Sequence, residues 1–312
     1  MSEDVSYTPE EVAKILKISK YTVYELIKRD ELAAYHVGRK VRVEAADIEA
    51  YKRNSKNVTP FAASATPPTY PSSRSPLDEG LIICGQDMTL DILTRHLEKK
   101  FPHVRFLRQN IGSIDGLMAL YRGMANVVTA HLWDSDTNDY NTPYVRRMLP
   151  GHRVLLINMV YRTEGFYVAK GNPKKILTWT DLARSDLSFV NRERGSGARV
   201  LLDEHLKIQE IAHQYVNGYS NEEMSHIAVA SKVARGEADV GLGIEKAAQQ
   251  VNNVDFVPLQ TERYDLVVRT EDIDKPYFQA LMSILKSEAF RNEILGIGSY
   301  DVTRMGEIMA EI

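Results

Sequence analysis

A proline-rich segment at residues 57–79 divides this chain of 312 residues into two parts of very different length. The segment holds five of the chain's twelve prolines, its other residues are mainly serine, threonine and alanine, and it shows no apolar periodicity. This composition is typical of a semi-extended linker, since structureless loops of such length are uncommon inside compact domains. The sequence therefore predicts a small domain at 1–56, a linker at 57–79 and a large domain at 80–312.

The formal net charge of −3 conceals an unequal distribution along the chain. Residues 1–56 carry a net charge of +1 and residues 57–312 one of −4, and within the small domain residues 17–42 reach +4. The single cysteine, Cys84, excludes a disulfide framework. The N-terminus shows no secretory pattern and the apolar runs are too short to span a bilayer, so we expect a cytoplasmic protein without a membrane partner.

The small domain is predicted to begin with two short helices joined by a tight turn. Thr8, Pro9 and Glu11 form a helix start with a capping box, and Ser19 is suited to cap a second helix. A β-hairpin then turns at Gly38, and a last helix is expected at about residues 44–53. Two short helices followed by a basic hairpin describe a helix-turn-helix with a wing, which can read base edges and grip phosphates.

The stretch YTPEEVAKILKISKYTVYELIKRDELAAYHVGRKVRVEAADIEAYKRN resembles the winged helix-turn-helix of the excisionase and MerR-like families. The resemblance covers about 46 residues and implies binding of double-stranded DNA through the second helix and the wing. A small protein-interaction domain with a solvated basic face is the alternative. The DNA-binding residues carried over from the resemblance are Ser19, Lys20, Thr22, Tyr24, Lys28, Arg39 and Lys40.

In the large domain, short apolar runs alternate with helical patterns, which indicates parallel βα units. The pattern predicts strands at 81–84, 104–108, 127–131, 187–191, 239–242 and 256–259, and helices at 89–100, 113–124, 198–207, 225–235 and 244–250. In such sheets ligands bind beyond the carboxyl ends of the strands, against helix N-termini. The segments just after the strands, at 85–89, 110–113, 192–199 and 241–243, are therefore the candidate binding loops.

The stretches FVNRERGSGARVLLDEHL and AVASKVARGEADVGLGIEKAA resemble the second lobe of type II periplasmic-binding-protein folds. Such folds occur in cytoplasmic regulators related to molybdate-binding proteins and in LysR-type effector domains. The resemblance covers most of residues 80–312 and implies a two-lobed, doubly wound α/β domain with a ligand cleft. Asp87 departs from an oxyanion site, because a carboxylate repels an anion, and capping the following helix is its alternative role. His131 lies in a loop that either adds specificity or is an ordinary polar loop.

The residues predicted to bind the ligand share a place at a strand end, at a helix N-terminus or near the return crossover. They are Asp87, Thr89, Gly112, Ser113, His131, Ser196, Gly197, Arg199 and Tyr264.

No P-loop, H-E-x-x-H, C-x-x-C or hydrolase elbow is present, and the eight histidines lack metal-ligand spacing, so we predict no catalytic residue, metal or cofactor. The leading hypothesis is a homodimeric, ligand-responsive transcription regulator whose effector is a small solute, with oxyanions such as molybdate or tungstate as candidates. One alternative is an enzyme on the same fold with Asp87 as its catalytic candidate. The other is an excisionase-like architectural DNA-binding protein.

Overall fold

The computed structural model describes residues 6–28, 32–37, 40–55 and 80–312. The chain forms two compact units, residues 1–72 and residues 73–312, and each is described on its own. The linker predicted at 57–79 lies outside the described residues.

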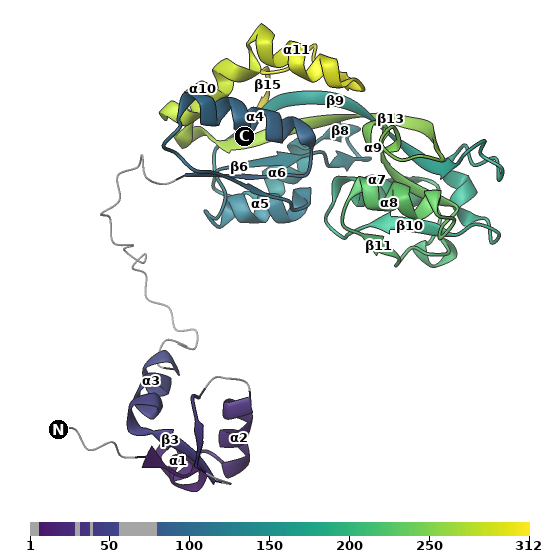
Figure 1. Ribbon diagram of the computed structural model, residues 1–312. Coiled ribbons are helices and arrows are strands. Elements are labelled where there is room, and N and C mark those ends of the chain that lie inside the picture. Colours follow the sequence, from purple (N-terminus) through teal and green to yellow (C-terminus); the bar gives the residue numbers. More distant parts are fainter. Residues whose placement is uncertain (1–5, 29–31, 38–39, 56–79) are drawn as a thin grey trace. The chain divides into compact units, whose positions relative to one another are not determined.

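The first unit is a small winged helix-turn-helix (Figure 1). Val12, Val23, Leu32 and Val43 are among the residues of its apolar core. Its elements are β1 (Ser6–Tyr7), α1 (Pro9–Leu16), α2 (Lys20–Lys28), β2 (Tyr35–Val37), β3 (Lys40–Glu44) and α3 (Ala45–Ser55), and the sheet order is β1-β3-β2.

Side-chain caps fix the ends of the two helices. Thr8 and Glu11 form the predicted capping box at the start of α1. The hydroxyl of Ser19 accepts a hydrogen bond of 3.0 Å from the backbone N–H of Thr22, so the predicted cap of the second helix is confirmed as well. Lys17 ends α1 in the left-handed conformation (φ 55°), which turns the chain sharply into α2.

The second unit has two lobes built on one sheet of ten strands. The first lobe contains β4 (Leu81–Cys84), α4 (Met88–Lys100), β5 (Phe106–Gln109), α5 (Ser113–Tyr121), β6 (Val127–Ala130), β7 (Trp133–Asp134), β8 (Asp139–Tyr140) and α6 (Thr142–Met148). The last segments of the chain are η3 (Thr270–Asp272), α10 (Pro276–Leu285), α11 (Glu288–Ile297), β14 (Tyr300–Asp301) and β15 (Ile308–Glu311). Helices α4 and α10 cover one face of this half of the sheet, and α5 and α6 cover the other (Figure 1).

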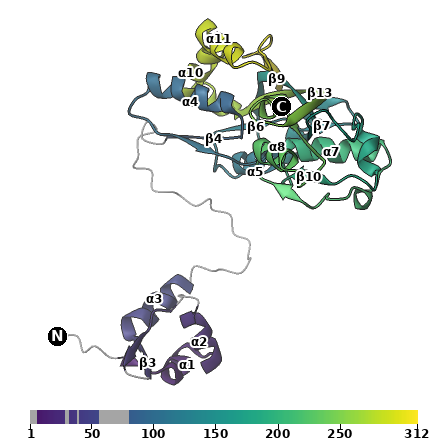
Figure 2. The ribbon, with the colours of Figure 1, turned by 45° about the vertical axis from the view of Figure 1, so that its right-hand side comes forward.

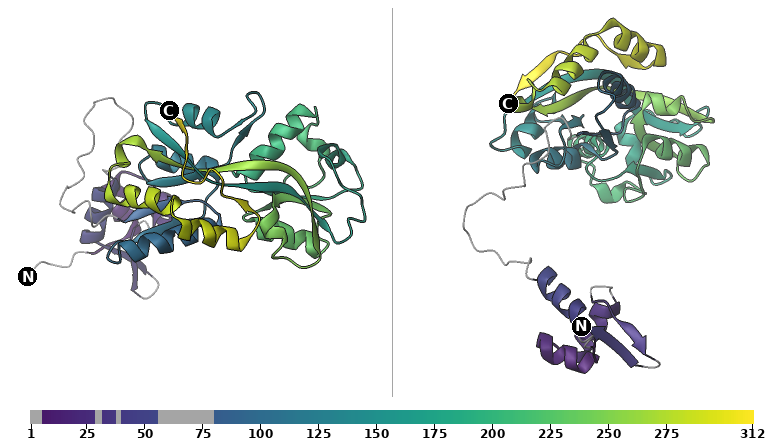
Figure 3. Two further views of the ribbon diagram at one scale, coloured as in Figure 1. Left: turned by 90° about the horizontal axis from the view of Figure 1, so that it is seen from above. Right: turned by 60° about the vertical axis from the view of Figure 1, so that its left-hand side comes forward.

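The second lobe has the same three-layered construction. Its elements are η1 (Trp179–Ala183), β10 (Phe189–Arg192), α7 (Gly197–Ile208), η2 (His213–Tyr215), β11 (Glu222–Glu223), α8 (His226–Ala234), β12 (Val240–Ile244) and α9 (Glu245–Ala248). One apolar cluster lies under α7 and another under α8 and α9. Figures 2 and 3 show the two lobes from other directions.

Two strands of 16 residues each, β9 (Val154–Ala169) and β13 (Val254–Arg269), run through both lobes and join them. They pair antiparallel along their whole length, and β9 also pairs antiparallel with β12. The predicted α/β class with two lobes is confirmed, but the sequence does not predict β9 and places only residues 256–259 of β13 in a strand. The parallel pattern holds for β4, β5 and β6 and for β10, β11 and β12, whereas the crossing strands run the other way. No helix in the described ranges is both long and apolar enough to span a bilayer.

Gly165→Ala is predicted to destabilise the second unit, because a Cβ at Gly165 would lie 2.2 Å from the carbonyl oxygen of Val257 on the neighbouring crossing strand. We expect a loss of about 1–3 kcal/mol in the free energy of unfolding. Urea denaturation followed by tryptophan fluorescence measures it, because both tryptophans, Trp133 and Trp179, lie in this unit. Gly296→Ala is the control: it has no neighbour within 4 Å and lies in helix α11, so it should not destabilise. Equal midpoints for the two variants would contradict the prediction.

Candidate ligand-binding cleft

The two lobes touch each other through glycines at two helix N-termini. The backbone N–H of Ile114, in the first turn of α5, donates a hydrogen bond of 3.0 Å to the carbonyl of Gly195, which precedes α7 in the other lobe. A Cβ at Gly112 would lie 2.9 Å from that same carbonyl oxygen, and one at Gly197 only 2.2 Å from His131 Nδ1. Larger side chains at these positions would collide with the facing lobe, so the two glycines allow the lobes to lie in direct contact.

Two adjacent cavities lie where the lobes meet. The inner cavity has a volume of about 10 Å³, room for a single water molecule. The outer cavity measures about 270 Å³ and mixes apolar side chains such as Met88 and Ile227 with polar ones such as Asn110 and Lys246. Gln86 and His226 line both cavities, so the two are neighbouring parts of one cleft.

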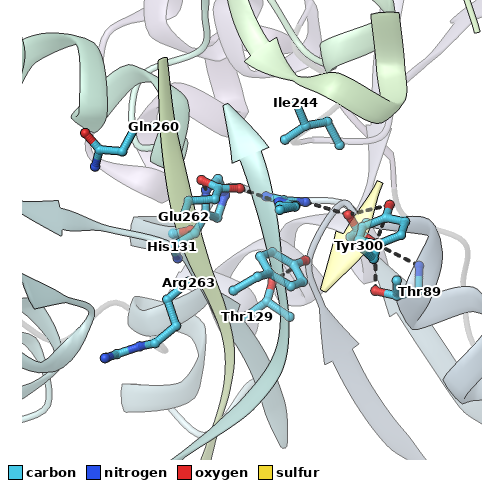
Figure 4. A network of polar contacts seen from close by, with 12 residues as sticks. Thr89, Thr129, His131, Ile244, Gln260, Glu262, Arg263 and Tyr300 are labelled. Atoms are coloured by element: carbon cyan, nitrogen blue, oxygen red, sulfur yellow. Dashed lines mark hydrogen bonds and ion pairs between the residues drawn. The ribbon is translucent and has the colours of Figure 1, made fainter. Parts of the chain in front are cut away.

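The floor of the cleft is formed by the crossing strands. Arg162 pairs with Glu262, and Glu164 with Gln260, in the β9–β13 register, so alternate side chains from both strands point to one face. The Arg162 guanidinium forms ion pairs with Asp87 and with Glu262, and it lies over the ring of Tyr264, 4.1 Å from the ring centre. Figure 4 shows this chain of contacts from Glu262 toward Tyr300 and Thr89.

Asp87 has two structural roles at once. It is the N-cap of α4, accepting hydrogen bonds from the Thr89 backbone N–H (2.8 Å) and hydroxyl (2.6 Å). It also pairs with Arg162 and accepts a hydrogen bond of 3.2 Å from the Tyr300 hydroxyl. The alternative capping role is therefore what the structure shows, together with an ion pair that the sequence analysis does not anticipate.

The two buried glutamates of the floor have opposite protonation tendencies. Burial by itself would raise the pKa of Glu262, but Arg162 and His131 outweigh it and lower that pKa to about 2. Burial raises the pKa of Glu164 well above its usual value, and repulsion from Glu262 adds to the effect. Burial also lowers the pKa of His226 well below its usual value, with repulsion from Arg192 as a further cause. The floor thus contains one firmly ionised carboxylate beside one whose ionisation is strongly opposed.

A polar clasp joins the lobes above this floor. Arg192, at the end of β10, donates hydrogen bonds of 2.8 Å from Nε and Nη2 to the two carboxylate oxygens of Glu193. The same guanidinium donates to Gln86 of the first lobe at 2.6 Å, and Gln86 donates back to Glu193 at 3.1 Å. Both guanidinium groups of the cleft, those of Arg162 and Arg192, therefore have carboxylate partners.

The structure brings most of the predicted ligand residues to the cleft. Asp87 lines the outer cavity, and Gly197 packs against His131. The predicted residues that line the inner cavity are Gly112, Ser113, His131, Ser196 and Tyr264.

Thr89 and Arg199 are not among the described residues that line either cavity. The Thr89 hydroxyl donates to Asp87, and the Arg199 guanidinium bonds the Arg192 carbonyl and Glu222 and lies over Tyr219. These bonds hold both side chains within their own lobes, with Arg199 Nε left as a buried donor without a hydrogen-bond partner among the described residues.

Several residues of the cleft are not predicted from the sequence because the crossing strands are not recognised there. Charged side chains two residues apart in a largely apolar run, Arg162 and Glu164, are the signal that was available. Residues of the inner cavity that the sequence did not single out include Gln86, Thr129, Arg162, Arg192 and His226. Glu164 and Glu262 lie on the crossing strands beside Arg162 but are not among the described residues that line either cavity. His131, Glu164 and Glu262 place potential metal-ligand atoms within 4.8 Å of one another, although the sequence shows no metal-ligand spacing.

In the first unit, the residues predicted to contact DNA lie around the start of α2 and on β3. Ser19, Lys20, Thr22 and Tyr24 are exposed, and Lys20 forms an ion pair with Glu10. Lys40 is exposed at the start of β3. Lys28 is the last residue of α2, and Arg39 lies outside the described residues. Tyr21, which the sequence analysis does not select, is 75% exposed on the same helix.

Arg162→Met is predicted to destabilise the second unit by about 3–5 kcal/mol, because it leaves the buried carboxylates of Asp87 and Glu262 without their cation. Arg304→Met removes an arginine whose ion pair with Glu307 is about half exposed, so its effect should stay within about 1 kcal/mol. Urea denaturation at neutral pH compares the two variants with the wild-type chain. A small effect at Arg162 would mean that the floor can rearrange around the unpaired carboxylates.

Comparisons with known proteins agree with this arrangement. A family model for a helix-turn-helix domain matches residues 6–56, and one for a PBP (periplasmic-binding-protein) superfamily domain matches residues 94–286, more than half of the chain. The uncharacterized protein YvgK of Bacillus subtilis (strain 168) is 42% identical over 311 residues, which covers all of both chains. An uncharacterized protein from the 5′ region of a 2Fe-2S ferredoxin gene of Clostridium pasteurianum is 50% identical over 113 residues, covering 36% of this chain and all of that protein.

Among solved structures, a putative phosphate ABC transporter substrate-binding protein from Clostridium perfringens with bound phosphate has a similar fold. The TM-score is 0.53 at 15% sequence identity, and the match covers 72% of this chain and 99% of that one. The expected fusion of a helix-turn-helix head with a periplasmic-binding-protein-like body is confirmed. The chain belongs to the PBP superfamily through its second unit and, over its whole length, to the same family as YvgK.

Proposed function

We propose that this protein is a ligand-responsive transcription regulator that acts by binding, without catalysis, in the cytoplasm. The observation that carries the proposal is the presence in one chain of a winged helix-turn-helix and a two-lobed domain whose lobes close on a polar cleft. A DNA-binding module supplies sequence recognition, and a closing cleft supplies a conformational equilibrium that a ligand can shift.

The DNA side of the proposal rests on the exposed face of α2 and the start of β3. Tyr21 and Tyr24 expose 75% and 44% of their surface on α2, so their rings are available for contact with DNA. Lys20 and Lys40 add positive charge at the same elements. In winged helix-turn-helix proteins the second helix enters the major groove and basic residues of the wing contact phosphates.

The effector side rests on the cleft between the lobes. The N-termini of α5 and α7 meet there, and their N–H groups together with the hydroxyl of Ser113 are suitable donors for an anion. The hydroxyl of Ser196 donates to the Glu193 carbonyl at 2.9 Å and would have to turn to join them. An oxyanion such as molybdate or tungstate is therefore the first candidate. The inner cavity, at about 10 Å³, is too small for such an ion, whereas the adjoining outer cavity of about 270 Å³ has room for one while the lobes stay in contact.

Coupling requires that the effector bind the closed lobes more tightly than the open ones. We propose that the chain acts as a homodimer, since two-fold symmetric operators suit two-fold symmetric proteins. Closure would then change the spacing of two heads on DNA. Sharp bending of DNA with no effect of any ligand would instead favour an architectural role.

Asp87 gives little support to an enzymatic role. Its carboxylate is already engaged by Arg162, Thr89 and Tyr300, so it is not available as a free general base. Binding therefore explains the cleft better than catalysis at this residue.

Lys40→Ala is predicted to weaken DNA binding to a similar degree on all sequences, because a lysine at the wing contacts a phosphate. On a duplex obtained by selection from a random pool, the slope of log K against log salt should fall by about 0.9. Tyr24→Ala should instead reduce the discrimination between the selected duplex and a scrambled one. Fluorescence anisotropy measures both, with Lys99→Ala on helix α4 of the second unit as the control. Unchanged binding in both head variants would contradict the proposed DNA face.

A thermal-shift screen of the full chain against molybdate, tungstate, sulfate, phosphate and a panel of small metabolites tests the effector. A true effector at 100 times its Kd should stabilise the second unit by about 2.7 kcal/mol. Gly197→Ala should remove most of this stabilisation, because its Cβ meets His131 and holds the lobes apart, whereas Gly296→Ala should keep it. No stabilisation by any anion would overturn the oxyanion candidate, and no response of DNA binding to any stabilising compound would overturn the regulator itself.

A further inference from the structure

Glu164 is a buried carboxyl group whose oxygens have no hydrogen-bond donor when the group is ionised. Its side chain is 0% exposed on β9, and in the described part of the chain no donor reaches either oxygen, although a protonated Glu164 can share its proton with Glu262. An ionised carboxylate in such a place is strongly unfavourable unless a cation or a set of donors accompanies it. The position therefore needs a further positively charged species when the group is ionised.

Two further potential ligands face Glu164 from other strands. Glu262 is 1% exposed on β13, and the side chain of His131, just after β6, is 11% exposed. The candidate ligand atoms of the three residues all lie within 4.8 Å of one another, and His131 Nδ1 is 2.9 Å from Glu262 Oε2. Two ligands of one zinc ion, each bonded at about 2.0–2.2 Å, are separated by roughly 2.9–3.5 Å. The His131–Glu262 separation of 2.9 Å lies in this range, and the 4.8 Å bound on the cluster means that Glu164 reaches the same ion after a small shift of its side chain.

The charges around the cluster favour a cation. The carboxylates of Asp87, Glu164 and Glu262 face the single guanidinium of Arg162, and Arg192 is already paired with Glu193. Arg162 Nε bonds Oε1 of Glu262, which leaves Oε2, now bonded to His131, for an ion. With all three carboxylates ionised, a divalent ion would balance the excess negative charge.

We propose that His131, Glu164 and Glu262 form a binding site for one divalent transition-metal ion at the floor of the cleft. An imidazole nitrogen with two carboxylates suits Zn²⁺, Co²⁺ or Mn²⁺ better than Mg²⁺, which prefers oxygen ligands and bound waters. His131 also lines the inner cavity, whose volume of about 10 Å³ leaves room for one water or one ligand atom in a fourth position. The site does not depend on the proposed regulatory role, because it follows from the geometry of the crossing strands alone.

The test uses the full chain stripped with a chelator and then dialysed against Zn²⁺, Co²⁺ or Mg²⁺. Elemental analysis should find one zinc per chain, calorimetry should show binding of Zn²⁺ but not of Mg²⁺, and Co²⁺ should give ligand-field absorption typical of a low-coordinate site. Glu164→Gln keeps the size of the side chain but removes its charge, so it should weaken Zn²⁺ binding at least about tenfold. His131→Gln should do the same and change the Co²⁺ spectrum.

The controls separate this cluster from other sites. His96→Gln removes a histidine that pairs with Glu293 and is not among the described residues lining either cavity, and Glu237→Gln removes an exposed carboxylate, so neither should change the affinity for Zn²⁺. Circular dichroism checks that each variant is folded. If Glu164→Gln does not fold, pulsed electron paramagnetic resonance of the Mn²⁺-loaded wild-type chain decides: a ¹⁴N coupling from imidazole supports the site.

Absence of stoichiometric Zn²⁺ binding, equal affinity in Glu164→Gln, absence of the ¹⁴N coupling, or loss of affinity in His96→Gln would each overturn the proposal. In the first two cases the buried carboxyl group of Glu164 keeps a proton instead of a metal. DNA binding measured on the same samples shows separately whether the regulator hypothesis stands, so the two can fail independently.

Discussion

The geometry of the second unit depends on one buried guanidinium. Arg162 lies where the crossing strands pass from one lobe to the other, and it pairs with Asp87 at the N-terminus of α4 and with Glu262 on β13. A buried charge requires partners in good geometry, so this arginine fixes a helix of the first lobe against both crossing strands. Tyr264 and Tyr300 enclose the arrangement from two sides.

Contacts between the lobes are of a kind that can be made and broken. The glycines at 112 and 197 allow close approach without interlocking side chains, and Gln86 joins the lobes through hydrogen bonds to Arg192 and Glu193. Such contacts contribute little free energy compared with the apolar cores inside each lobe. Each lobe is thus stabilised by its own core, while the contacts between the lobes are weak. A ligand can shift the position of one lobe relative to the other only if the contacts between them are weak in this way.

The chemistry of the cleft differs from that of a simple anion site. Helix N-termini and hydroxyls at the edge of the inner cavity suit an anion, whereas the floor below carries more carboxylates than guanidinium groups. Arg162 faces the Asp87 carboxylate and pairs with it, so the charge of that carboxylate is compensated inside the protein.

The sequence by itself determined the features that depend on local interactions. The capping box of Thr8 and Glu11, the Ser19 cap and the glycine-rich helix starts at 112 and 197 follow from short-range hydrogen bonding and sterics, and the structure contains them. The two sequence motifs, one in each unit, also predicted the fold family correctly, because each is a continuous stretch of the chain. Only the tertiary structure decided that β9 and β13 cross both lobes, because strand pairing between residues about 100 positions apart leaves no local pattern. For that reason the sequence could not predict that Arg162, Glu164 and Glu262 lie close together. It also could not predict that Arg199, which follows the Gly-Ser-Gly motif at residues 195–197, is held within its own lobe by Glu222 and Tyr219.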